Sequence, residues 1–230
     1  MIMEKEKLFN GIKAVIFDLD GTLVDSLGIW NQIDSEFFRM HGTEVPSDYQ
    51  DWIAHMNFME MANFTHNAYG FKESPEEIAD IWTRMSVDHY SHTIKAKPYA
   101  KEFVKKLYDL GYPIGLVTTN KKELYEACLK NNGMWDYFSS ALDVNDLNSS
   151  KKDPTCYLMM AKSLHADVSS TLVFEDILMA VRTCKTAGFR TVAVQDEADM
   201  KDKDAICSLA DFYLEDYQDL IHTDIVSRVD

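Results

Sequence analysis

Short runs of consecutive apolar residues recur along the chain, separated by longer segments with a helical period. The first run, residues 13–17, ends abruptly at Asp18 and is followed by Gly21. A run of about four to eight apolar residues bounded by polar or turn residues is typical of a strand that is buried on both faces. Similar runs lie at 113–117, 140–142, 171–174 and 191–194, and a weaker one at 212–214. These runs predict the strands of a parallel sheet.

Amphipathic helical patterns fill most of the segments between these runs. One apolar stripe ends just before Gly111, a residue type that often follows the last turn of a helix. Residues 154–164 and 178–187 have the same period, and Gly188 follows the second of them. Strands that alternate with helices predict an α/β fold with a doubly wound, Rossmann-like parallel sheet that is covered by helices on both faces.

Residues 26–94 interrupt this alternation. They contain no convincing strand pattern, but a second helical segment begins near Pro75, and an earlier stripe is formed by Trp30, Ile33, Phe37 and Met40. We therefore expect a helical domain of residues 26–94 inserted into an α/β core made of residues 1–25 and 95–230.

Polar residues follow several of the predicted strands directly. In open parallel sheets, ligands bind beyond the carboxyl ends of the strands, so these residues are the candidates for chemistry. They are Asp18 and Asp20 after the first run, Thr118 and Thr119 after the second, Lys151 in the loop after the third, and Glu175 and Asp176 after the fourth.

The segment Asp18-Leu19-Asp20-Gly21-Thr22 carries the most specific signal in the chain. It resembles the first motif of the haloacid dehalogenase superfamily, in which the first aspartate is the nucleophile and the second is a general acid and base. The later motifs are matched in order by Thr118, by Lys151 and by the pair Glu175-Asp176. The resemblance covers nearly the whole chain. It points to the phosphatase branch near the beta-phosphoglucomutase and phosphoglycolate phosphatase-like group, whose inserted helical domain is a mobile cap.

The resemblance implies a magnesium-dependent phosphatase that passes through a phosphoaspartate. A carboxylate nucleophile is repelled by a phosphate dianion unless a cation screens the two, and clustered carboxylates suit Mg²⁺. The implied catalytic residues are Asp18, Asp20, Thr118 and Lys151. The implied phosphate-binding residues are Gly21, Thr22, Thr119 and Asn120, and the implied metal ligands are Asp18, Asp20, Glu175 and Asp176.

Some of these assignments have plainer interpretations. Lys152 stands beside Lys151, and the usual lysine-proline pair of the family is absent, although Lys151 has the expected spacing to Pro154. A solvated lysine pair would look the same in sequence. Likewise, Thr118 taken alone could be a helix N-cap. The pair Glu175-Asp176 taken alone could be acidic residues at a helix start, where they stabilise the helix dipole.

The charge balance limits the partners. The formal net charge is -15, and no segment concentrates basic residues, so we expect neither nucleic acid nor anionic membrane as a partner. No apolar run approaches the roughly 20 residues that span a bilayer, and the four scattered cysteines read as reduced thiols of a cytoplasmic protein. Residues 26–94 hold few basic side chains, which favours a monophosphate substrate with a neutral remainder, such as a sugar phosphate.

Three other functions fit the pattern less well. A dehalogenase would leave Asp20 and the acidic pair Glu175-Asp176 without a role. A phosphomutase shares the first half-reaction, but Trp30 stands where related mutases carry a histidine. A non-catalytic binding module would be expected to lack one of the catalytic carboxylates, and none is missing. The sequence leaves the oligomeric state open.

Overall fold

The computed structural model describes residues 4–26, 28–53, 56, 58–147 and 149–228. The chain divides into two compact units. The core unit consists of Met1–Leu27 and Ile94–Asp230, and the helical unit consists of Gly28–Thr93.

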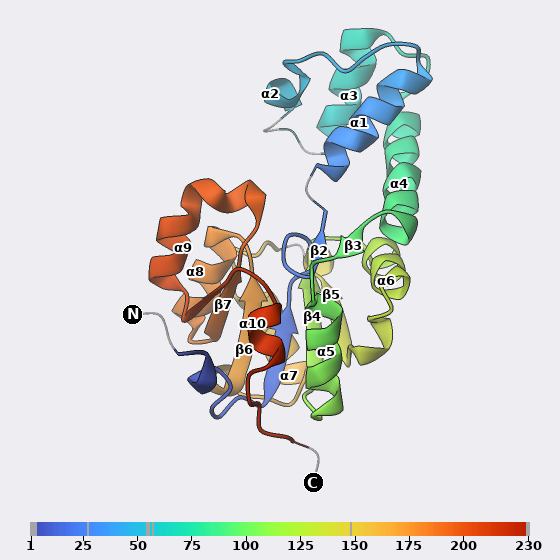
Figure 1. Ribbon diagram of the computed structural model, residues 1–230. Coiled ribbons are helices and arrows are strands. Elements are labelled where there is room, and N and C mark those ends of the chain that lie inside the picture. Colours follow the sequence, from blue (N-terminus) through green and yellow to red (C-terminus); the bar gives the residue numbers. More distant parts are fainter. Residues whose placement is uncertain (1–3, 27, 54–55, 57, 148, 229–230) are drawn as a thin grey trace. The chain divides into compact units, whose positions relative to one another are not determined.

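The core unit is built on a six-stranded sheet with the strand order β5-β4-β1-β6-β7-β8 (Figure 1). Every neighbouring pair in this sheet is parallel. The bounds are β1 Ala14–Phe17, β4 Ile114–Thr118, β5 Ser140–Asp143, β6 Thr171–Glu175, β7 Arg190–Val194 and β8 Phe212–Leu214. From β1 the chain adds β4 and β5 on one side and then β6, β7 and β8 on the other, so the strand order reverses beside β1. The predicted doubly wound α/β fold is confirmed.

Helices cover both faces of this sheet, with α5 and α10 in front of it in Figure 1 and α7 and α8 behind it. The bounds are α5 Ala100–Asp109, α6 Lys122–Asn131, α7 Thr155–Ser163, α8 Leu178–Ala187, α9 Lys203–Leu209 and α10 Gln218–Ile221. Gly188 follows α8 with φ +94°, a backbone conformation that glycine adopts at low cost, so it ends the helix as predicted.

Alternate residues of β1 face opposite layers of helices. Ala14 and Ile16 belong to a buried cluster that also contains Tyr157 of α7. Phe17 points the other way, since its ring contacts Phe103 of α5 at a centroid distance of 6.3 Å. This period of two follows from the pleat of a strand. It places the residue after Phe17 on the side of α7.

The helical unit contains α1 Ile29–Met40, α2 Tyr49–Ile53, α3 Phe58–Tyr69 and α4 Pro75–His92, and its described residues form no strand. Ser74 and Glu77 form a capping box at the start of α4, where Pro75 takes the first helical position. The core of the unit is rich in aromatic contacts, such as that between Phe37 and Trp82 at 5.6 Å. None of the described helices has the length and apolar character that a bilayer crossing needs.

Two very short strands lie in the core unit where the chain leaves it and returns to it. β2 Val24–Asp25 pairs with β3 Lys95–Ala96 in an antiparallel sheet of two strands. The side chain of Asn132, at the end of α6, also accepts a hydrogen bond from the Ala96 N–H at 2.7 Å. The last residues before α5 are therefore fixed to the core unit.

Candidate active site

The strand register brings the predicted acidic residues together. Phe17 of β1 pairs with Phe174 of β6, so the residues that follow, Asp18 and Glu175, lie beside each other at the carboxyl ends of neighbouring strands. Thr118 ends β4 on the other side of β1. The crevice beyond these strand ends is where the reversal of strand order favours ligand binding.

The loop after β1 approaches the acidic loop after β6 very closely. Gly21 has φ +73°, and a Cβ atom added to it would lie 2.2 Å from Oδ2 of Asp176. Thr22 turns its hydroxyl toward the same group, 3.1 Å from Oδ1 of Asp176 and 3.5 Å from Oδ2 of Asp18. Only glycine fits at position 21, because it accepts the left-handed backbone and leaves room for the carboxylate.

Lys151 lies inside this group of carboxylates. Its ammonium is 2.5 Å from Oδ1 of Asp18 and 2.6 Å from Oε1 of Glu175, and its side chain is only 5% exposed. Burial lowers the pKa of Lys151, but the charges of Asp18 and Glu175 more than offset this and hold the pKa above its usual value. The neighbouring Lys152 is exposed. The structure thus places Lys151 at the site and Lys152 in solvent.

The three carboxylates are too close together to be balanced by one lysine. Burial raises the pKa of Glu175 to about 7, although Lys151 opposes the shift. Burial and the charges of Asp18 and Glu175 raise the pKa of Asp176 well above its usual value. When all three carboxylates are ionised, the cluster with Lys151 carries two uncompensated negative charges, which a divalent cation would balance.

The cluster suits a hard divalent cation in its donors as well as its charge. Asp18, Glu175 and Asp176 each offer an oxygen, and these oxygens lie within 4.8 Å of one another. Oε2 of Glu175 is buried and has no hydrogen-bond partner among the described residues. Carboxylate oxygens are the ligands that Mg²⁺ prefers. Asp20, the fourth expected ligand, is not part of this group.

Asp20 instead interacts with the loop after β4. Asn120 donates from its side-chain amide to Oδ2 of Asp20 at 2.5 Å, and its backbone N–H donates to the Thr118 hydroxyl at 3.1 Å. Asp20 is half-buried, in contrast to the buried Asp18. Thr119 has an exposed side chain, and its carbonyl accepts a hydrogen bond from Asn145. The structure therefore brings Asn120 and Asp20 together and leaves the Thr119 side chain in solvent.

Two tyrosines support the site and were not predicted from the sequence. Tyr157 of α7 donates to Oε1 of Glu175 at 2.6 Å. Tyr217, just before α10, donates to the backbone carbonyl of Thr22 at 3.1 Å. Both side chains are buried. In sequence each looks like a core aromatic residue, so no pattern marked either of them as part of the site.

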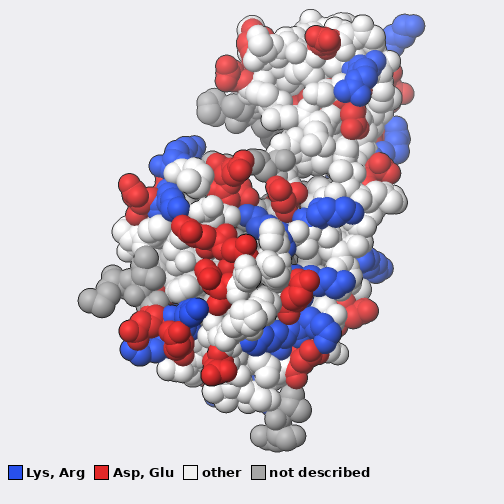
Figure 2. All heavy atoms as spheres, viewed as in Figure 1, with Lys and Arg blue, Asp and Glu red and all other residues white. Residues whose placement is uncertain are grey.

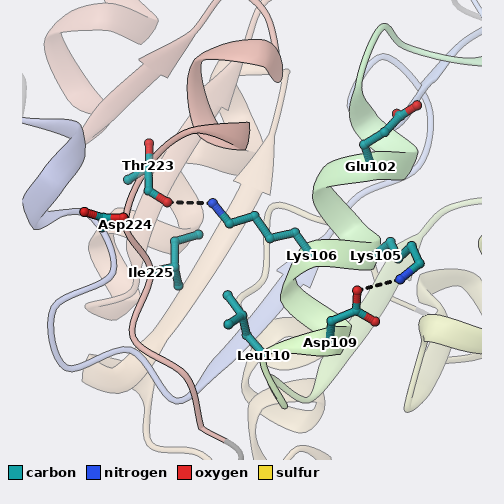
Figure 3. Close-up of a pocket in the computed structure, with 8 residues that line it drawn as sticks. All are labelled: Glu102, Lys105, Lys106, Asp109, Leu110, Thr223, Asp224 and Ile225. Atoms are coloured by element: carbon teal, nitrogen blue, oxygen red, sulfur yellow. Dashed lines mark hydrogen bonds and ion pairs between the residues drawn. The ribbon is translucent and has the colours of Figure 1, made fainter.

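A separate pocket lies between α5 and the segment after α10, away from the strand ends (Figure 3). Lys106 reaches across it and donates to the carbonyl oxygens of Ile221 and Thr223 at 2.7 and 2.6 Å. Because this ammonium is occupied by backbone carbonyls, we assign the pocket no chemistry. Figure 2 shows acidic and basic side chains interspersed over the face in view, with no continuous basic surface.

The core unit combines a doubly wound α/β sheet with a buried cluster of three carboxylates and a lysine at the carboxyl ends of its strands. The chain belongs to the haloacid dehalogenase-like hydrolase family, whose model matches residues 15–194. This confirms the resemblance inferred from the motifs, and with it the assignment as a hydrolase.

Two relatives of known sequence agree with the family, and a solved structure shares the fold. The chain is 28% identical over 184 residues to the "Putative phosphatase YhcW" of Bacillus subtilis (strain 168), a match that covers 80% of this chain and 83% of that protein. It is 26% identical over 186 residues to the pyrophosphatase PpaX of Bacillus cereus (strain Q1), covering 80% and 83%. Among solved structures, a "putative beta-phosphoglucomutase from Thermotoga maritima" superposes with a TM-score of 0.79 at 21% identity, covering 91% of this chain and 97% of that one. The predicted phosphatase branch of the family is supported by the names of the first two.

Proposed function

We propose that this protein is a magnesium-dependent phosphomonoester hydrolase that forms a phosphoaspartate on Asp18. The observation that carries the proposal is the buried cluster in which Lys151 bridges Asp18 and Glu175 beside Asp176. Phosphoryl transfer depends mainly on positioning and charge neutralisation, and this cluster supplies both a fixed carboxylate and cationic screening.

Asp18 is the nucleophile in this account. Lys151 holds Oδ1 of Asp18 at 2.5 Å, which fixes the carboxylate and leaves Oδ2 to attack phosphorus. A bond forms between Oδ2 and phosphorus while the bond from phosphorus to the ester oxygen breaks. Water then attacks phosphorus, the bond between phosphorus and Oδ2 breaks, and inorganic phosphate leaves with Asp18 restored as a carboxylate. A bound Mg²⁺ would screen the repulsion between carboxylate and phosphate, and Asp18, Glu175 and Asp176 are the residues that would hold it.

Asp20 is the general acid and base. Its proton goes to the leaving ester oxygen in the first step, and its carboxylate takes a proton from water in the second. The side-chain amide of Asn120 orients it through the contact with Oδ2. Asp20 is half-buried whereas Asp18 is buried, so the Asp20 carboxylate is the more accessible of the two to a leaving group. We propose Asp20 as a metal ligand only through its backbone carbonyl.

The remaining predicted residues would bind the phosphate oxygens. The Thr118 hydroxyl and the ammonium of Lys151 are buried at the strand ends, and Thr22 would supply a backbone N–H from the loop after β1. The Gly21 N–H donates to the Val24 carbonyl at 3.0 Å, so Gly21 would serve the phosphate site through the room that it leaves in the loop. The helical unit would act as the cap that excludes water from the leaving-group side. Because the helical unit has few basic residues, the substrate would be a small metabolite with one phosphate group, such as a sugar phosphate. We place this activity in the cytoplasm.

The experiment is a panel of phosphate esters, with pyrophosphate included, assayed for phosphate release with Mg²⁺ and with excess chelator. We expect turnover of at least one ester with Mg²⁺, none in chelator, and none for Asp18→Asn in either condition. Full activity in chelator, or in Asp18→Asn, would contradict the proposal. Analysis of the same reactions for isomerised sugar phosphate distinguishes a phosphomutase from a phosphatase.

A further inference from the structure

Tyr157 contacts the carboxylate cluster through its hydroxyl, whereas its ring packs in the apolar core. The ring lies in the buried cluster between α7 and the sheet, with Phe189 at a centroid distance of 6.3 Å. A phenylalanine would fill that space equally well. The hydroxyl is the part that packing does not explain, because burying it is costly unless it finds a hydrogen-bond partner. Its partner is Oε1 of Glu175, 2.6 Å away.

Two donors therefore converge on the same oxygen of Glu175. Lys151 donates to Oε1 at 2.6 Å, and Tyr157 donates to it at the same distance. Oε2 has no partner among the described residues, although the side chain is only 1% exposed. A buried carboxylate oxygen without a partner is costly, so its position indicates a ligand. Because both donors bind Oε1, Oε2 is the oxygen that would face a ligand.

Lys151 alone would define this orientation poorly. It shares its ammonium with Oδ1 of Asp18 at 2.5 Å, and the last torsion of a glutamate side chain is broad and has no strong preference. Tyr157 is held more rigidly, because it lies in the first turns of α7. Asp153, which precedes the N-cap residue Pro154, accepts a hydrogen bond from the Thr155 N–H at 2.8 Å and so satisfies the first N–H of that helix.

We infer that Tyr157 is a positioning residue that fixes the Glu175 carboxylate so that Oε2 faces the bound metal. The inference rests on the proposed function, since it assumes that Asp18, Glu175 and Asp176 hold Mg²⁺. Groups that orient metal ligands through hydrogen bonds typically contribute about 10-fold to 100-fold to metal affinity. Tyr157 acts through Glu175 and does not touch the substrate.

The test is Mg²⁺ binding to the full chain without substrate, measured by isothermal titration calorimetry. Tyr157→Phe should raise the Kd for Mg²⁺ at least about tenfold. With saturating Mg²⁺, its kcat should stay within about threefold of the wild type, because the residue serves the metal site and not the reacting atoms. The melting temperature of the metal-free variant checks that the chain is folded.

Tyr112→Phe is the matched control. Tyr112 is also a buried tyrosine of the core unit, and its hydroxyl donates to the Val226 carbonyl at 3.1 Å, but it precedes β4 at the opposite end of the strands. Its removal should leave the Kd for Mg²⁺ unchanged. A wild-type Kd in Tyr157→Phe, or an equal rise in both variants, would overturn the inference.

A double-mutant cycle adds an independent criterion. In a Glu175→Gln background, Tyr157→Phe should change the Kd for Mg²⁺ no further, because the carboxylate that it orients is gone. Effects that multiply in the double variant would mean that Tyr157 acts elsewhere, and the inference would fail. A wild type that turns over substrate without binding Mg²⁺ would instead overturn the proposed function, and this inference with it.

Discussion

Replacing Lys151 by methionine removes the ammonium that lies between Asp18 and Glu175 while keeping most of the side-chain volume. The ammonium contacts Asp18 and Glu175 at 2.5 and 2.6 Å and is almost fully buried. Removing one partner of a buried ion pair costs about 3–5 kcal/mol. For a chain of this size, about 1 kcal/mol lowers the melting temperature by roughly 2–4 °C, so Lys151→Met should melt roughly 6–20 °C below the wild type in chelator.

The matched control is Lys152→Met, since Lys152 is adjacent in sequence but exposed. It should change the free energy of unfolding by less than about 0.5 kcal/mol. Added Mg²⁺ should recover part of the stability lost in Lys151→Met, because a divalent cation replaces the missing charge. Activity with saturating Mg²⁺ should still fall about 10²-fold to 10³-fold, as for the loss of one group that stabilises developing charge.

Thermal unfolding by circular dichroism, with and without chelator, and phosphate release measure both effects. If Lys151→Met melts together with Lys152→Met and retains the same turnover, the cluster is not organised around Lys151. The assignment of Asp18 as a screened nucleophile would then lose its main support.

Three further changes test separate parts of the account. Gly21→Ala should cost more stability than Gly11→Ala, because both glycines have positive φ but only the new Cβ at 21 meets Asp176, and chemical denaturation compares them. Equal costs would refute the steric argument. Asp176→Asn should raise the Mg²⁺ concentration for half-maximal activity at least about tenfold, and an unchanged requirement would exclude Asp176 as a ligand. Burial raises the pKa of Asp34 from 3.8 to about 6, so folding is favoured at low pH and loses about 3 kcal/mol as the pH rises from about 4 to above 6. Asp34→Asn should remove that dependence in pH-resolved unfolding, whereas the exposed Asp51→Asn should retain it.

The sheet and the acidic residues at its edge were predictable because their signals are local. Each apolar run marks a strand, and the residue after it must lie at the carboxyl edge of a parallel sheet. Asp18 and Glu175 therefore come together through register alone. The antiparallel pair β2 and β3 was not predicted, since strands of two residues leave no periodic pattern.

The finer parts of the site depend on contacts that no sequence period encodes. The spacing to Pro154 favoured Lys151 over Lys152, but the burial of Lys151 between Asp18 and Glu175 could not be read from the sequence. Tyr157 reads as an apolar position of an amphipathic helix, and its hydroxyl acquires a role only because Glu175 ends the neighbouring strand. Asn120 was predicted as a phosphate-binding residue, whereas the contact of its side-chain amide with Asp20 was not predicted.

The most direct test of the central claim is to trap the phosphoryl group on Asp18. Asp20→Ala should still accept it from an aryl phosphate, whose phenolate leaves without a proton, but it lacks the base that activates water for the second step. Mixing this variant with p-nitrophenyl phosphate and Mg²⁺ should give a burst of phenolate equal to the enzyme concentration. Peptide mass spectrometry after a rapid quench should then find one phosphoryl group on Asp18. Slow steady turnover without a burst, or phosphate on any other residue, would contradict the account.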